Sequence, residues 1–382
     1  MKIKLAMAQA NLTIRGGAER VVLKIAEHYN ATIYTAEYKK DSTFEEFKDL
    51  DIKEIGSSGF YKFLGYGRAA QGLNYGLSFY NYKVKEDYDV LNPHIAPSHW
   101  IRHKNDRVLW YCHTPLRDLY DLYYYRQSLR PFAKRTLYSF IVPRIRFIDK
   151  RMVNKIKYIV ANSENTKNRI KKYYGRNDAV VLNGGIDYKE YKNEGNDRYF
   201  FYPSRISPNK RQDYAIRAFK IFKSQNKGMN YRLIISGQVS DDPFYMDYYS
   251  KITNMAKNVG GVSILTDVND KDLIDLYSKA TAILYPPINE DYGLVPLEAA
   301  ASGKPVIVVN EGGPKETVIN NKTGFLINNE LDMAEKMQKL AEDPQLVENM
   351  GKRGRERVKK YYSWNNFFKE FDKLLYKTKN EK

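Results

Sequence analysis

Short apolar runs alternate with longer amphipathic stretches along most of the chain. The first run, near residues 3–8, leads through a glycine pair into a segment whose apolar residues recur with helical spacing. Similar runs predict further strands near residues 31–35, 89–91, 108–111, 158–161, 180–182, 199–202, 232–236, 263–265, 282–285, 305–309 and 324–327. Strands that alternate with helices are typical of parallel, doubly wound α/β sheets. The pattern therefore predicts two Rossmann-like halves.

The junction between the halves is predicted near residues 183–197, where Asn183, two glycines and Asp187 supply turn chemistry. We expect a first domain over residues 1–187 and a second over residues 188–360. After Pro344 the pattern indicates two amphipathic helices, and the apolar stripe of the last one must be buried.

Composition narrows the class of protein. Of 382 residues, 43% are hydrophobic and 28% charged, which excludes a disordered tail or a fibrous chain. The single cysteine, Cys112, excludes an intramolecular disulfide framework and a multi-cysteine metal site, and it favours a reducing compartment, the cytoplasm. The most apolar stretch, residues 136–148, is interrupted by Pro143 and two arginines. We therefore expect a soluble or peripheral protein.

The net charge of +18 favours anionic partners. Residues 117–157 hold eleven Lys or Arg residues against three acids, interleaved with eight aromatic residues. Such a segment suits an anionic membrane surface. Two other interpretations stay open: a solvated basic helix pair with a buried aromatic face, and a nucleic-acid surface.

The densest chemical signal lies in residues 289–327. No G-x-G-x-x-G fingerprint and no P-loop occurs in the chain, so nicotinamide and simple P-loop chemistry are unsupported. Glu290 is expected on a loop and Glu298 on a helix that Pro296 opens. The backbone N–H groups of residues 293–295 would form an anion site, while the carboxylates take sugar or ribose hydroxyls. The alternative is two glutamates that face water.

This run, with Arg205 and Lys210 upstream, resembles the donor-binding domain of the retaining glycosyltransferases of family 4. The resemblance rests on two glutamates that bracket seven residues, an alanine-rich helix, and two later motifs. These motifs are Ser302-Gly303 with Pro305-Val306, and Gly312-Gly313 with Glu316. The usual phenylalanine before Gly293 is Tyr292 here, which keeps the ring.

The first half agrees with this resemblance. Its matching segments are the glycine loop at Gly16-Gly17, the run Ala161-Asn162-Ser163 before a helix, and the linker at residues 181–187. The match is weakest over residues 36–90 and 115–150, where acceptor specificity would lie.

The resemblance implies the GT-B fold, an α/β architecture of two Rossmann-like parallel-sheet domains that face each other across a cleft. Residues 1–187 would bind the acceptor and residues 188–360 the nucleotide-sugar donor, while a C-terminal helix within 361–382 returns to the first domain. The implied enzyme is a retaining hexosyltransferase that moves mannose or glucose from a nucleoside-diphosphate sugar to an acceptor hydroxyl. The acceptor would be a lipid-linked or cell-envelope glycan, and the enzyme would be cytoplasmic and peripheral at the membrane.

The resemblance also implies roles for single residues. Arg205 and Lys210 would neutralise the diphosphate, Glu298 would hold the ribose, and Glu290 would hold hydroxyls of the transferred sugar. The remaining cofactor-binding or donor-binding positions are Gly16, Gly17, Gly293, Leu294 and Val295.

His113 would contact the donor sugar. Its run, Tyr-Cys-His-Thr-Pro, resembles the mannosyltransferase-like branch and favours GDP-mannose. The alternative for His113 is a satisfied buried histidine, and for the basic pair of Arg205 and Lys210 it is a solvated surface pair. The other histidines are predicted to be structural: His28, His94, His99 and His103.

No nucleophile is evident beside His113, so a front-face route, in which the departing phosphate takes the acceptor's proton, is expected. No metal and no other cofactor would be required. Two alternative functions stay open: a GT-B sugar synthase or epimerase, and a basic nucleic-acid-binding protein on a transferase scaffold. The glutamates and the Arg205/Lys210 pair argue against the second.

Overall fold

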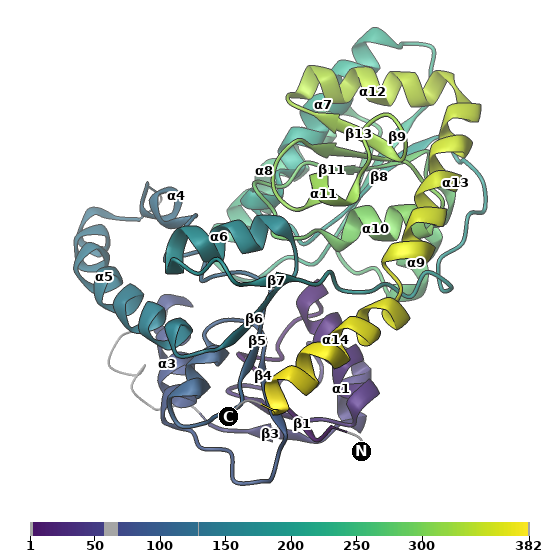
Figure 1. Cartoon of the computed structure of the whole chain (residues 1–382). Helices are drawn as coiled ribbons and strands as arrows, with labels where there is room; N and C mark the ends of the chain where they lie inside the picture. The colour runs from purple at the N-terminus through teal and green to yellow at the C-terminus, as the bar shows by residue number, and fades with distance from the viewer. Residues whose placement is uncertain (1–2, 57–67, 129, 381–382) are drawn as a thin grey trace. The chain divides into compact units, whose positions relative to one another are not determined.

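The computed structural model describes residues 3–56, 68–128 and 130–380 (Figure 1). The chain divides into two compact units. The first unit comprises Met1–Gly184 and Phe368–Lys382, and the second comprises Gly185–Phe367. The predicted boundary at residue 187 lies within the same linker. Each unit is built on parallel strands with helices between them, as the alternating pattern predicts.

Two parallel sheets form the centre of the first unit. Their strands are β1 (Leu5–Gln9), β2 (Thr32–Thr35), β3 (Ile52–Glu54), β4 (Val90–Pro93), β5 (Leu109–Cys112), β6 (Tyr158–Ala161) and β7 (Val180–Val181). The strand orders are β3-β2-β1-β4 and β5-β6-β7, and a parallel bridge between Leu91 and Val108 joins the two sheets. Strands β1, β4 and β5 are buried along their whole length, as expected of parallel strands covered on both faces. Strand β3 has no predicted counterpart, because its three residues form no apolar run.

The helices of the first unit are α1 (Gly17–Tyr29), α3 (Arg68–Asn81), α4 (Tyr123–Ser128), α5 (Phe132–Asn154) and α6 (Glu164–Tyr174), with short 3-10 helices at Glu45–Asp49 and Ser98–His103. The last helix, α14 (Trp364–Lys379), returns to this unit and lies beside α1 (Figure 1). Tyr29 Oη donates to Asp372 Oδ1 over 2.8 Å, and the rings of His28 and Phe368 stack at 3.7 Å. The apolar stripe of this helix is thereby buried.

A buried carboxylate anchors α5 to the core of the first unit. Asp149 Oδ1 accepts from His99 Nε2 at 2.9 Å and from Trp100 Nε1 at 2.8 Å, while Oδ2 accepts from Tyr120 and Tyr174 at 3.0 and 2.8 Å. Burial opposes the ionisation of Asp149, but these hydrogen bonds hold the pKa of its carboxyl below the usual value.

No helix among the described residues is long and apolar enough to cross a membrane.

A single parallel sheet forms the centre of the second unit. Its strands are β8 (Tyr199–Pro203), β9 (Arg232–Ser236), β10 (Val262–Leu265), β11 (Ala282–Tyr285), β12 (Val306–Val309) and β13 (Gly324–Ile327). The helices are α7 (Gln212–Gln225), α8 (Pro243–Val259), α9 (Asp270–Lys279), α10 (Leu294–Ala301), α11 (Pro314–Thr317), α12 (Glu330–Glu342) and α13 (Pro344–Tyr361), with a short 3-10 helix at Pro208–Lys210.

The strand order of this sheet, β10-β9-β8-β11-β12-β13, reverses direction between β8 and β11. From β8 the chain winds outward through β9 to β10, and then it crosses to β11 on the other side of β8. In doubly wound sheets, ligands bind at the carboxyl ends of the two strands where the order reverses. The loops after β8 and β11 are therefore the first place to look for a site.

Candidate active site

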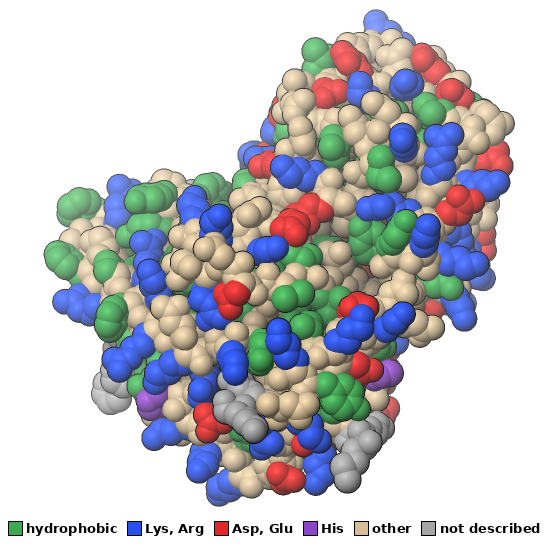
Figure 2. All heavy atoms as spheres, viewed as in Figure 1, with side chains coloured by type: hydrophobic (Ala, Val, Ile, Leu, Met, Phe, Trp, Pro, Cys, Tyr) green, Lys and Arg blue, Asp and Glu red, His purple; other side chains and the backbone are tan. Residues whose placement is uncertain are grey.

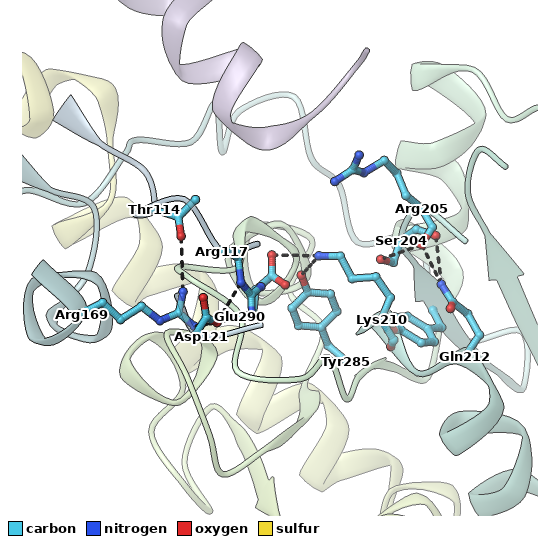
Figure 3. A network of polar contacts seen from close by, with 11 residues as sticks. Thr114, Arg117, Asp121, Arg169, Ser204, Arg205, Lys210, Gln212, Tyr285 and Glu290 are labelled. Atoms are coloured by element: carbon cyan, nitrogen blue, oxygen red, sulfur yellow. Dashed lines mark hydrogen bonds and ion pairs between the residues drawn. The ribbon is translucent and has the colours of Figure 1, made fainter. Parts of the chain in front are cut away.

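The loop after β8 holds Arg205 and Lys210. Gln212, at the start of α7, fixes the loop. Its Nε2 donates to the carbonyl of Arg205 at 2.9 Å (Figure 3), and its Oε1 accepts from the backbone N–H of Ser207 at 3.4 Å. The carbonyl of Lys210 accepts a hydrogen bond from the buried Tyr202 hydroxyl. Arg205 is exposed, whereas Lys210 is buried. The loop thus presents exposed Arg205 and buried Lys210 at the carboxyl end of β8, while Arg211 pairs with Glu311 at 2.7 Å.

Lys210 meets Glu290, which follows β11 (Figure 3). Lys210 Nζ lies 2.8 Å from Glu290 Oε1 and donates to Tyr285 Oη at 3.3 Å. Burial raises the pKa of Tyr285 well above its usual value, and the charges of Glu290 and Glu298 act in the same direction while Arg205 opposes them. Tyr285 therefore stays a neutral phenol. The charges of Arg205, Glu290 and Glu298 act on the Tyr285 phenol, and Lys210 contacts it.

Glycines hold the turn around Glu290. The backbone N–H of Gly313 donates to the Glu290 carbonyl at 2.7 Å, and a Cβ on Gly312 would lie 2.5 Å from the same oxygen. Gly293 caps α10 with a φ of 81°, a left-handed conformation that favours glycine. The helix begins at Leu294, two residues before the Pro296 that the sequence suggests as its start. Its first residues, Leu294 and Val295, are half-buried.

Glu298 lies on α10, as expected, and has a partner that the sequence does not reveal. Tyr277 Oη, from α9, donates to Glu298 Oε2 at 2.6 Å. Tyr277 is buried, and burial followed by the charge of Glu298 raises the pKa of its phenol well above the usual value. The phenol is therefore a permanent donor that fixes one oxygen of the carboxylate. The other oxygen, Oε1, stays the better placed one for a ligand hydroxyl.

In the first unit, the glycine loop follows β1. Gly16 is the N-cap of α1 in extended conformation, and a Cβ there would lie 2.4 Å from Glu19 Oε2. Gly17 is the first residue of the helix, so its backbone N–H lies in the first turn, where such groups have no partner within the helix. The carboxylate of Glu19, in the same first turn, therefore lies against this end of the helix.

His113 follows β5 at the carboxyl end of the same set of strands. Its Nε2 lies 3.0 Å from Nδ1 of His94, which follows β4. His94 Nε2 in turn lies 2.8 Å from Asn92 Oδ1, and Asn92 Nδ2 donates to the Leu109 carbonyl at 2.6 Å. His94 is fully buried, and only 7% of His113 is exposed. Burial lowers the pKa of His113 to about 3 and that of His94 well below its usual value, so both rings are neutral at physiological pH.

A compact ion-pair cluster follows His113 in the chain. Arg117 donates to Asp121 Oδ2 through Nε at 3.0 Å and Nη2 at 2.9 Å, and Arg169 Nη2 lies 3.3 Å from the same oxygen (Figure 3). Arg169 also donates to Thr114 Oγ1 at 3.4 Å. These contacts fix the start of the segment that connects β5 to α5.

The structure thus groups Arg205, Lys210, Glu290 and Glu298 in the second unit, with the turn at residues 293–295. In the first unit, Gly16 and Gly17 follow β1 and His113 follows β5, with β4 between these two strands. His94, which the sequence predicts to be structural, contacts His113. Sequence reasoning also misses Asn92, Tyr277 and Tyr285, and only the position of Asn92 and His94 directly at the end of a strand could have drawn attention to them. No group of three or more His, Cys, Asp or Glu side chains in the described ranges could hold a metal ion.

Known proteins show the same two-part organisation. The family model described as "Glycosyltransferase Family 4" matches residues 15–190, and that described as "Glycosyl transferases group 1" matches residues 185–357. The alpha-1,3/1,6-mannosyltransferase ALG2 of Mus musculus is 28% identical over 92% of this chain and 91% of its own length. The Homo sapiens protein of the same name is 27% identical over 95% of this chain and 93% of its own.

Among solved structures, Anabaena Alr3699/HepE in complex with UDP has a TM-score of 0.74 and 16% identity, covering 98% of this chain and 100% of its own. Sucrose-phosphate synthase from Thermosynechococcus elongatus has a TM-score of 0.76 and 18% identity, covering 98% of each chain. These likenesses establish the GT-B fold that the sequence predicts. Since the two family models together match residues 15–357, the chain belongs to the glycosyltransferases of group 1 and family 4.

Proposed function

We propose that this glycosyltransferase moves a hexose, mannose before glucose, from a nucleoside-diphosphate sugar to an acceptor hydroxyl with retention of configuration. The observation that carries the proposal is the Lys210–Glu290 pair beside exposed Arg205, at the point where the strand order of the second unit reverses. GDP-mannose is the favoured donor because the relatives that match nearly the whole chain are named mannosyltransferases. UDP-glucose is the competitor, because neighbours in fold bind UDP or UDP-glucose.

The pair at Lys210 suggests how a donor is received. When a diphosphate binds next to Arg205, Lys210 would give up one of its present contacts and bind a phosphate oxygen instead. Glu290 would then accept hydrogen bonds from hydroxyls of the sugar. Glu298, with one oxygen fixed by Tyr277, would hold the ribose. Backbone N–H groups at residues 293–295 and at Gly16 and Gly17 would supply further donors to the diphosphate.

Catalysis would follow from these positions. The bond between the sugar's anomeric carbon and the phosphate oxygen breaks, and the new bond to the acceptor oxygen forms on the same face. The acceptor's proton passes to the departing phosphate oxygen. Negative charge grows on the diphosphate in this step, and by analogy with the deletion of one oxyanion-hole donor, the loss of a group that meets such charge costs about 3 to 4 kcal/mol. Arg205 and Lys210 would supply this stabilisation without a metal ion.

Calorimetric titration with GDP, UDP and ADP tests the donor site. One nucleotide should bind, and Arg205→Ala and Glu298→Ala should each lower its affinity. The control Arg353→Ala, which removes an exposed arginine of α13, should leave the affinity unchanged. Transfer assays with GDP-mannose and UDP-glucose, with the anomeric configuration of the product read by NMR, then test the reaction. Isomerised nucleotide sugar without transfer would indicate an epimerase, and nucleic-acid binding without nucleotide binding would contradict the proposal.

We also propose that the acceptor lies at an anionic membrane that the enzyme contacts through α4 and α5. Phe132, Phe140 and Phe147 are 81%, 64% and 67% exposed, which supports a membrane contact through these three side chains, whereas Tyr120 is buried. Figure 2 shows apolar and cationic side chains side by side over this part of the first unit. Each cation near an anionic surface contributes about 1 kcal/mol, and exposed aromatic rings insert at the interface.

Sedimentation with vesicles tests the membrane contact. The protein should sediment with phosphatidylglycerol-containing vesicles more than with pure phosphatidylcholine, and Phe140→Ser with Phe147→Ser should reduce this binding. Tyr361→Ser, which removes an exposed aromatic side chain of α13 in the second unit, is the matched control. Equal binding to both vesicle types, or no effect of the phenylalanine substitutions, would contradict this part of the proposal.

A further inference from the structure

Three side chains form a directed hydrogen-bonded chain that ends at His113. Asn92 Nδ2 faces the Leu109 carbonyl at 2.6 Å, so Asn92 Oδ1 must be the atom that faces His94. Oδ1 can only accept, and His94 Nε2 therefore carries a hydrogen and donates it over 2.8 Å. The Leu109 carbonyl thus fixes the orientation of the Asn92 amide, and this amide fixes the tautomer of His94.

The tautomer of His94 then decides that of His113. A neutral imidazole carries one N–H, so His94 Nδ1 has no hydrogen and must accept. The atom opposite, 3.0 Å away, is His113 Nε2, which therefore donates. Both rings are neutral because burial disfavours the imidazolium and lowers both pKa values. His113 Nδ1 is left without a hydrogen, as a hydrogen-bond acceptor.

That nitrogen is available to a ligand. His113 Nδ1 has no hydrogen-bond partner within the described residues, and it is not among the buried polar atoms that lack one. Nδ1 of His99 shows the contrast, since it is buried without a partner while its Nε2 is held by Asp149. His113 thus keeps an accessible acceptor nitrogen at the carboxyl end of β5.

We propose that Asn92 and His94 are positioning residues that hold His113 as the Nε2–H tautomer, so that Nδ1 accepts a hydrogen bond from a hydroxyl of the transferred sugar. The inference rests on the proposed function and deepens it. An acceptor nitrogen attracts an O–H group and repels the ionised oxygens of a diphosphate, so His113 discriminates sugar from phosphate. It is not a general base, because a ring this reluctant to take a proton cannot remove one from a hydroxyl at neutral pH.

Nitrogen NMR on histidine-labelled protein tests the tautomer directly, and the chain has only five histidines. In the free protein, His113 and His94 should both show protonated Nε2 and bare Nδ1. A His113 signal with hydrogen on Nδ1 would overturn the proposal, and no variant is needed for this result. On binding GDP-mannose the Nδ1 resonance of His113 should shift, whereas GDP alone should leave it in place. An unchanged resonance with bound sugar nucleotide would equally overturn the proposal.

His94→Phe tests the positioning role. It removes the acceptor opposite His113 Nε2 and should let His113 populate both tautomers, with kcat/KM lowered about tenfold, the effect of one misoriented hydrogen bond. In His94→Gln the new side-chain oxygen can still accept from His113 Nε2. This variant should therefore keep most of the Nε2–H tautomer of His113 and most of the activity. A single His113 tautomer and full activity in the phenylalanine variant would contradict the inference. If no nucleotide sugar binds at all, the proposed function fails, while the tautomer seen in the free protein stands or falls separately.

Discussion

The two units use one topology to build two different kinds of polar cluster. In each, the candidate site residues lie at the carboxyl ends of parallel strands. In the second unit the cluster is ionic: Lys210 and Glu290 lie 2.8 Å apart and keep part of their surface in solvent. In the first unit the cluster of Asn92, His94 and His113 is neutral and almost fully buried.

This difference follows from burial. Removing a charge from water is costly unless a partner compensates for it, so a fully buried ring such as His94 can only be neutral. The Lys210–Glu290 pair escapes this penalty because each ion has the other as partner and both reach solvent. An ionic cluster suits a diphosphate that gains charge during the reaction, whereas a neutral cluster suits hydroxyl groups.

Removing the ionic cluster should have the largest effect. In Lys210→Met the diphosphate loses a fixed cation and Glu290 loses its partner, so kcat/KM should fall about 100- to 1,000-fold, as when a transition-state donor is deleted elsewhere. Steady-state kinetics measures the loss, and Lys220→Met, on the exposed face of α7, is the control that should keep full activity. Activity within threefold of wild type in Lys210→Met would mean that the ionic cluster is only structural.

Acid should destabilise the first unit more than the second. The pKa of His113 is about 3 in the fold against 6.5 in the unfolded chain, so the unfolded chain binds the extra proton between these values and stability is lost as pH falls below 6.5. Each such histidine lowers the free energy of unfolding by about 1.4 kcal/mol per pH unit. The two histidines with lowered pKa values, His94 and His113, lie in the first unit, so hydrogen-exchange protection factors, which are corrected for the intrinsic rate at each pH, should fall there between pH 7 and pH 5 and not in the second unit.

A matched pair of variants sharpens this result. His113→Gln should reduce the acid sensitivity of the first unit, and His28→Gln, which removes an exposed histidine, should not. An equal fall of the protection factors in both units would show that His94 and His113 do not control the acid response.

A smaller effect is expected from the phenol that fixes Glu298. Tyr277→Phe removes the 2.6 Å hydrogen bond and leaves the packing of the ring, so nucleotide affinity should fall about tenfold or less. Titration with GDP and with its 2′,3′-dideoxy analogue isolates the ribose contact. The substitution should lower the affinity for GDP more than the affinity for the analogue. An equal loss of affinity for both would place Glu298 away from the ribose.

The sequence predicts the local parts of this molecule well. The strand order along the chain, the loop after residue 203 with its two cations, and the placement of Glu290 on a loop and Glu298 on a helix all agree with the structure. Each depends on the spacing of nearby residues, which hydrophobic period and turn chemistry control. The short strand β3 is missed because it has no such pattern.

The contacts that give these residues their chemistry are not local. Lys210 meets Glu290 across 80 positions, because β8 and β11 are neighbours in the sheet although two other strands lie between them in sequence. His94 meets His113 for the same reason, since β4 and β5 are joined by the bridge at Leu91. No motif marks Asn92, His94 or Tyr277 as their partners. The sequence by itself determined the elements, the candidate charges and the family resemblance. Only the tertiary structure decided which side chains meet and which are buried, because strand order and burial fix the partner, the protonation state and the tautomer of each group.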